Sequence, residues 1–136
     1  QLLDDLLRQE RLRPVPRESG RITYHDACNL GRYNDIYEEP RRVLAGVTRG
    51  DLVEMSLNRS KGFCCGGGGG RAWLEEHEGR GVNQLRVEQA MEVKPDILAS
   101  ACPFCLTMFE DGVKAKEAGD TIKTRDIAEL LAERLE

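Results

Sequence analysis

The sequence predicts an α/β fold, with a small mostly parallel sheet flanked by helices and with cysteine loops at the carboxyl edge of that sheet. Two observations support this prediction. Short apolar segments alternate with longer segments of helical periodicity along the 136 residues. Three cysteine-containing segments each follow a predicted strand, and in parallel sheets ligands bind outside the carboxyl ends of the strands.

The first half of the chain is predicted to form two helices and two strands. Residues 1–13 place leucines on one helical face until two prolines end the helix. This helix packs either on its own domain or on a neighbouring domain. Residues 21–25 form a short strand that runs into the first cysteine loop. Residues 39–45 fit a short helix and residues 51–56 a second strand.

The second half repeats the alternation. Residues 71–93 are rich in helix-forming residues, and two glycines interrupt this segment. Residues 96–100 form an apolar strand, and a helix follows near Pro103 because proline fits a first helical turn. Residues 121–124 form a last short strand, and Asp126 caps the final helix.

Length and composition restrict the class of protein. A chain of 136 residues fits one compact core, which we divide into an N-terminal helix with a proline linker, residues 1–20, and a cysteine-rich domain, residues 21–136. The net charge of −4 argues against nucleic acid as a partner. No apolar run is long enough to span a membrane, and no signal peptide opens the chain.

The five cysteines indicate a metal or cluster site. Two of them are adjacent in sequence, and neighbouring Cα atoms are too close for a relaxed disulfide. An odd number of cysteines in such clusters favours a reducing compartment, so we expect a cytoplasmic location. Cysteine used only as a small apolar core residue is the alternative. The candidate ligands are Cys28, Cys64, Cys65, Cys102 and Cys105.

Residues 24–32, 63–71 and 101–105 carry a resemblance to a known family. They read Tyr-His-Asp-Ala-Cys-Asn-Leu-Gly-Arg, Phe-Cys-Cys followed by five glycines and Arg, and Ala-Cys-Pro-Phe-Cys. This pattern resembles the cysteine-rich CCG domain of the heterodisulfide reductase-like family. That family includes iron–sulfur subunits of glycolate, lactate and glycerol-3-phosphate oxidoreductases and electron-transfer-flavoprotein:quinone oxidoreductases. Its members commonly have proline where this chain has Ala27.

The resemblance implies an iron–sulfur cluster, either 4Fe-4S or non-cubane, and a role in electron transfer. Electrons would pass between a flavin or iron–sulfur donor and a quinone or disulfide, and the sequence looks most similar to the quinone-linked branch. The implied partners are a flavoprotein, a ferredoxin-like domain and a membrane quinone-reducing part, which would bring this domain to the inner face of the membrane. The chain therefore looks like a C-terminal piece of a larger oxidoreductase. This piece is not expected to be catalytic alone.

A structural zinc site is the alternative to a cluster. A CxxC pair is a common zinc half-site. The resemblance also keeps zinc open, since one copy of the motif looks like a zinc site in some relatives. In that case the chain would be an interaction domain within such a complex.

The five consecutive glycines are expected to donate backbone hydrogen bonds to the cysteine sulfurs. Without Cβ atoms, this backbone approaches the thiolates closely and turns N–H groups toward them. A helix beginning near Arg71 would add its positive end, and positive φ at Gly68 would make valine costly there. Neither the Walker A motif nor the dinucleotide fingerprint matches the run. The candidate cofactor-binding residues are Gly66, Gly67, Gly68, Arg32, Arg71 and His25.

His25 and Asp26 precede the first cysteine and have two interpretations. As a functional pair, they tune the cluster by hydrogen bonding or carry a proton coupled to reduction. As structural residues, Asp26 caps the loop and His25 fills the end of the strand.

Overall fold

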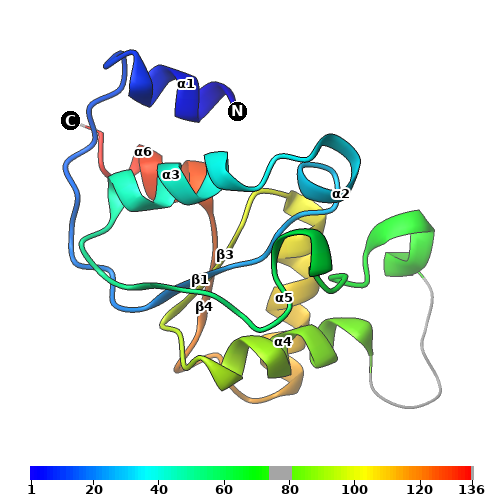
Figure 1. Cartoon of the computed structure of the whole chain (residues 1–136). Coiled ribbons are helices and arrows are strands. Elements are labelled where there is room, and N and C mark those ends of the chain that lie inside the picture. Colours follow the sequence, from blue (N-terminus) through cyan, green and yellow to red (C-terminus); the bar gives the residue numbers. More distant parts are fainter. Residues whose placement is uncertain (74–80, 136) are drawn as a thin grey trace.

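A four-stranded, all-parallel sheet lies at the centre of the computed structural model, which describes residues 1–73 and 81–135 (Figure 1). The strands are β1 (Ile22–Tyr24), β2 (Leu52–Val53), β3 (Ile97–Ser100) and β4 (Lys123–Asp126), in the order β2-β1-β3-β4. Ile22 of β1 pairs with Leu52 on one side and with Ile97 on the other. The predicted α/β fold with a largely parallel sheet is thus confirmed.

The strand order creates a switch point between β1 and β3. From β1 the chain moves outward to β2, whereas from β3 it moves outward to β4 on the other side. The loops that leave β1 and β3 therefore diverge, and the crevice between them is where such sheets bind ligands. Cys28 follows β1 and Cys102 follows β3, so both lie at this crevice.

One face of the sheet is covered by α1 (Leu2–Arg8), α3 (Glu38–Val47) and α6 (Ile127–Ala132) (Figure 1). Helix α3 contacts both α1 and α6. The predicted N-terminal helix ends at Arg8 and packs on its own domain, where buried Asp4 pairs with Arg42 of α3 at 2.6 Å. The buried residues of this face are Ile22, Tyr24, Val43, Leu44, Val47, Ala99, Ile127, Leu130 and Leu131.

The opposite face is covered by α4 (Val82–Glu92) and α5 (Pro103–Ala115), which pack against each other. Two site cysteines belong to this core, so the candidate site is continuous with the most buried part of the molecule. The buried residues of this face are Ala27, Met55, Cys65, Val87, Ala90, Leu98, Cys105, Phe109, Val113, Ala118 and Ile122.

Several element boundaries differ from the sequence prediction. The last strand begins at Lys123 instead of residue 121. The helix expected from residue 71 begins at Val82, after a 3-10 segment η2 (Gly68–Trp73), and its expected residues 74–80 lie outside the described residues. The sequence did not predict α2 (Gly31–Asn34) or the 3-10 turn η1 (Arg59–Lys61).

The predicted cap of α6 is confirmed. The Asp126 carboxylate accepts the Ala128 N–H at 2.7 Å, and the Glu129 carboxylate accepts the Asp126 N–H at 3.3 Å. This reciprocal capping box stops β4 and starts α6 within one residue. Among the described helices, none has the length and apolar character needed to cross a membrane.

Gly112 allows α4 and α5 to approach closely, and Gly112→Ala should destabilise the fold. A Cβ there would lie 2.9 Å from Val87 Cγ2 and 3.2 Å from the Asn83 carbonyl oxygen. Overpacking of about 1–3 kcal/mol should outweigh the gain in helix propensity. Thermal and urea unfolding measure the loss of stability.

Val87→Ala tests whether the contact between the new methyl group and Val87 causes the loss of stability. In the double variant the two losses should be less than additive, because the smaller side chain makes room for the new methyl group. A more stable Gly112→Ala protein, or strict additivity, would show that the contact does not limit helix packing.

Candidate metal centre

The structure gathers the five cysteines from three segments into one region. Cys28 follows β1, and the adjacent Cys64 and Cys65 follow η1. Cys102 is the N-cap of α5, and Cys105 lies in the first turn of that helix. A small hollow, partly open to solvent, is lined by all of these except Cys102. Cys102 joins the group through a hydrogen bond with Cys105.

The exposure of the cysteines is graded across the site. Cys65 and Cys105 are buried, Cys28 and Cys102 are half-buried, and Cys64 is exposed. All five thiols are free, so none is used in a disulfide. Four free cysteines line the hollow and the fifth, Cys102, adjoins Cys105, so together they form a donor set suited to soft metals or an iron–sulfur cluster.

Backbone N–H groups point at the sulfurs as the sequence predicted. The Gly66 N–H donates to Cys64 Sγ at 3.3 Å, and the Gly67 N–H donates to Cys65 Sγ at 3.4 Å. The positive end of α5 lies at Cys102 and Cys105. Donors and a helix dipole of this kind stabilise negative charge on sulfur before any metal binds.

Cys65 and Cys105 titrate as a pair. The hydrogen bond from Cys105 holds the pKa of Cys65 far below its ordinary value, and His25 and the Gly67 N–H act in the same direction against the effect of burial. The hydrogen bond to the Cys65 thiolate raises the pKa of Cys105. The first proton is therefore lost from the pair more easily than from an isolated thiol, and the second is lost less easily.

The conformation of the glycine run differs from the prediction. Positive φ occurs at Gly66, Gly69 and Gly70, with 90° at Gly66, whereas Gly68 does not have it. A Cβ on Gly68 would meet nothing within 4 Å. The predicted strain of a valine at Gly68 is therefore wrong, because the positions with positive φ in the run are Gly66, Gly69 and Gly70.

Gly66 also faces the start of α4. A Cβ on Gly66 would lie 3.1 Å from Val82 Cβ and 3.3 Å from the Asn83 nitrogen. A helix N-terminus, with its positive dipole end, was expected near Arg71. In the structure this N-terminus belongs to α4 and lies at Val82. The close approach of this helix to the backbone after Cys65 depends on the missing side chain at Gly66.

The two arginines proposed as compensating charges occupy different places. Arg32 lines the hollow and donates to the Gly62 carbonyl at 3.3 Å, so it lies next to the sulfurs. Arg71 is exposed in η2 and lies outside the described lining of the hollow. The structure therefore brings Arg32 to the site and leaves Arg71 at the surface.

His25 is buried between the sheet and α5. Its backbone N–H donates to the Ala99 carbonyl at 2.8 Å, and its ring lies edge-to-face on Phe109 with centroids 4.7 Å apart. Nδ1 accepts a hydrogen bond from Arg86 Nε at 3.2 Å. Burial lowers the pKa of His25, so the neutral ring carries its hydrogen on Nε2. This ring hydrogen-bonds Cys65, and a ring nitrogen and the sulfurs of Cys65 and Cys105 all lie within 4.8 Å of one another.

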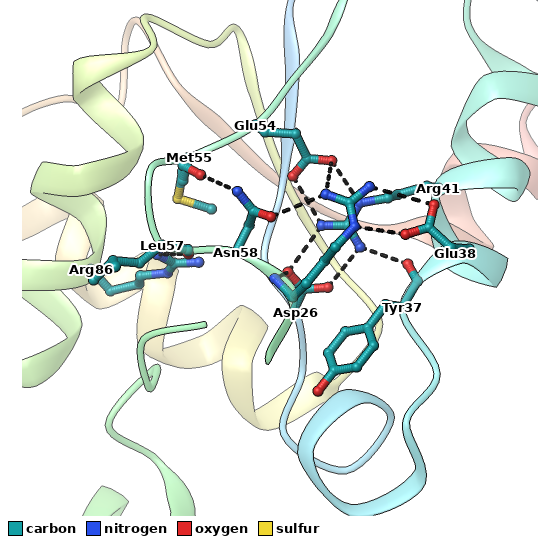
Figure 2. Close-up of polar contacts among 10 residues, drawn as sticks. Asp26, Tyr37, Glu38, Arg41, Glu54, Met55, Leu57, Asn58 and Arg86 are labelled. Atoms are coloured by element: carbon teal, nitrogen blue, oxygen red, sulfur yellow. Dashed lines mark hydrogen bonds and ion pairs between the residues drawn. The ribbon is translucent and has the colours of Figure 1, made fainter. Parts of the chain in front are cut away.

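Asp26 and Arg41 form a buried ion pair beneath the cysteine loops (Figure 2). Arg41 of α3 donates to both Asp26 oxygens, at 2.7 and 3.0 Å, and to Glu54 at 2.6 and 2.9 Å. Asp26 also accepts the Arg59 backbone N–H at 2.6 Å. The network ties the end of β1 to the segment after β2, and these segments lead to Cys28 and Cys64.

Sequence reasoning found Arg32 but missed the two buried arginines of the site, Arg41 and Arg86. One signal was available for Arg86, because it precedes Val87 and stands four residues before Ala90, and all three are buried on one face of α4. A charged residue at a core-facing position is rare unless it is paired. For Arg41 the pairing depends on residues far along the chain, and local sequence carries no signal of it.

The fold and the site together define a cysteine-rich α/β domain whose free thiols meet at the switch point of a parallel sheet. A family model described as "CCG: Cysteine-rich domain" matches residues 22–110, well over half of the chain. The chain belongs to this family, as the resemblance in the sequence implied.

Curated relatives match nearly the whole chain. It is 48% identical over 98% of its length to a probable iron-sulfur-binding oxidoreductase, FadF, from Bacillus subtilis. It is 40% identical over 100% of its length to an EtfAB:quinone oxidoreductase from Syntrophomonas wolfei. It is 39% identical over 99% of its length to one of the subunits of the dihydromethanophenazine:CoB–CoM heterodisulfide reductase from Methanosarcina barkeri. The chain spans 19%, 20% and 32% of these relatives. No solved structure matches the chain.

Asp26→Asn should destabilise the protein by about 3–5 kcal/mol, because it removes one partner of a buried ion pair. Burial raises the pKa of Asp26, but the hydrogen bonds from Arg41 and from the Arg59 N–H outweigh it and lower the pKa overall. The stability that Asp26 adds is therefore present above its unfolded pKa of about 3.9 and is lost as the pH falls through its folded pKa.

Urea unfolding at pH 7 and below pH 4 tests both parts of that prediction. The variant should lose less stability on acidification than the wild type. Asp51→Asn changes the same group at an exposed position and should have little effect. Equal acid sensitivity of the wild type and Asp26→Asn would contradict the role given to this carboxylate.

Gly66→Ala should lower the Tm of the metal-free protein, whereas Gly68→Ala should not. Alanine at Gly66 must adopt positive φ, at a cost of about 1–3 kcal/mol, and must also displace Val82. Alanine at Gly68 meets no neighbour and no strained φ. Differential scanning calorimetry of the two variants measures the difference, and equal Tm values would refute it.

Proposed function

We propose that this chain is an iron–sulfur electron-transfer domain of a heterodisulfide reductase-like oxidoreductase. The observation that carries the proposal is the convergence of five free cysteines from three segments at the switch point of the sheet. Membership in the CCG family and relatives described as an iron-sulfur-binding oxidoreductase and as a quinone oxidoreductase support it.

The donor set fits a cluster better than a single metal ion. A zinc ion takes four ligands, whereas five thiols are gathered here. The ligands we propose are Cys28, Cys64, Cys65, Cys102 and Cys105. Once bound, the cluster would accept and release electrons. The protein would hold it, donate hydrogen bonds to its sulfurs from Gly66 and Gly67, and shield it from water on the buried side.

The surrounding residues have distinct roles in this proposal. Arg32 lies at the open side, where its charge offsets the negative thiolates. His25 directs its ring toward the Cys65 sulfur from the buried side. Because burial keeps this ring neutral, it acts as a hydrogen-bond donor to sulfur and not as a cation.

Electrons would arrive from a flavoprotein or a ferredoxin-like domain and leave toward a quinone or a disulfide. The relatives are several times longer than this chain, and one is described as a quinone oxidoreductase and another as part of a heterodisulfide reductase. We also propose that the chain belongs to the quinone-linked branch and lies in the cytoplasm. Within the chain, we propose a boundary after residue 20, between the N-terminal helix with its proline linker and the cysteine-rich domain.

Metal analysis of the anaerobically reconstituted domain tests the cofactor. Iron and acid-labile sulfide should be present in similar amounts, with a brown colour and visible absorption. Replacement of any of the five cysteines by Ser should lower the iron content or change the spectrum. Thr107→Ala, at an exposed position of the helix that carries Cys105, is the control and should leave both unchanged.

Two results would reject the proposal. Stoichiometric zinc without sulfide would establish the structural-metal alternative. Wild-type iron content and spectra in all five single variants would show that these cysteines do not hold the cluster.

A further inference from the structure

Arg86 is fully buried, at 0% exposure, on the face of α4 that packs against the candidate metal centre. Its Nε donates to His25 Nδ1 at 3.2 Å. Its Nη1 donates to the Leu57 carbonyl at 2.9 Å and to Gln89 Oε1 at 2.6 Å. Figure 2 shows it reaching from its helix to the Leu57 carbonyl.

Within the described residues, these partners are all neutral. Nη2 of Arg86 is buried and has no hydrogen-bond partner there. Arg41, the other buried arginine of the site, has two carboxylates instead. A buried charge needs a partner of opposite sign, so the charge of Arg86 calls for a compensating negative group.

Among the residues that the structure describes, no carboxylate pairs with Arg86. Asp26 attracts the Arg86 charge, but it is already bound by Arg41. Burial lowers the pKa of Arg86 to about 10, which agrees with weak compensation by the protein and still leaves it a cation at neutral pH. The Cys65 and Cys105 sulfurs, proposed ligands of the cluster, lie within 4.8 Å of a nitrogen of the same His25 ring that Arg86 contacts, so the negative charge of a bound cluster would lie close to Arg86.

We propose that Arg86 is a positioning residue that fixes the tautomer of His25 toward the cysteine sulfurs and supplies the buried positive charge that raises the reduction potential of the cluster. This inference rests on the proposed function. The guanidinium can only donate, so Nδ1 of His25 must accept and its hydrogen must lie on Nε2. A cation in a region of low dielectric favours the more negative, reduced state of the cluster.

The test is the reduction potential of the reconstituted domain in three variants. Arg86→Gln removes the charge but keeps an amide donor for the Leu57 carbonyl, and Arg86→Lys keeps the charge without the planar fork. Arg21→Gln removes the same charge from an exposed position just before β1, at the opposite edge of the sheet from the cysteines.

In Arg86→Gln, the ratio of reduced to oxidised cluster at a fixed potential should fall at least tenfold, which is about 59 mV for a one-electron couple. Arg86→Lys should restore most of this ratio, and Arg21→Gln should leave it unchanged. The visible spectrum should also shift in Arg86→Gln, because the hydrogen bond from His25 to sulfur is no longer fixed.

A purely structural Arg86 would lower the Tm and leave the potential unchanged, and that result would overturn the inference. A failure of Arg86→Lys to restore the potential would overturn the part assigned to charge. Iron and sulfide are measured in every sample, so a wild type without them rejects the proposed function itself. A loaded wild type and a loaded Arg86→Gln with equal potentials reject only the role of Arg86.

Discussion

The buried pair of Asp26 and Arg41 is the constraint on which the cysteine site depends. Asp26 follows β1 and stands two residues before Cys28, and Arg41 comes from a helix on the opposite face of the sheet from α5. Because Arg41 also binds Glu54, and Asp26 binds the Arg59 backbone, the loops to Cys28 and Cys64 share one anchor. The pair is buried and holds these loops with protein groups alone, so much of the site geometry exists before a cofactor binds.

Two buried arginines near the site differ in the charge of their partners, and this difference determines how each affects the charge of the site. Arg41 is neutralised by Asp26 and Glu54 and therefore organises structure without adding charge to the site. Arg86 has neutral partners in the described part of the chain, so its charge acts on the sulfurs through His25. Hydrogen bonds from Gly66 and Gly67 add to this effect. Cysteine thiolates repel one another, and such surroundings let several share a small volume.

Sequence reasoning recovered what is local and missed what is formed between distant segments. The strands, the Asp126 cap and the cysteine loops follow from periodicity and capping rules that act over a few residues. The short helix Gly31–Asn34 lacks such a pattern, since it is fixed by hydrogen bonds such as that from the Tyr33 N–H to the Cys28 carbonyl. Positive φ was expected at Gly68, whereas it occurs at Gly66 in the first part of the run, where Val82 also approaches from a segment distant along the chain.

The site is asymmetric, and the asymmetry suits a carrier of electrons. On the buried side, Cys65, Cys105 and His25 pack into the core around Phe109, which keeps their positions fixed when the charge of the site changes. On the other side, Cys64 is exposed and the glycines after it carry no side chains that would cover the sulfurs. Rigid ligands reduce the reorganisation that accompanies a change in charge, and an open side lets a partner approach closely. The same backbone that exposes Cys64 also donates to its sulfur, so access is gained without leaving the thiolate unsupported.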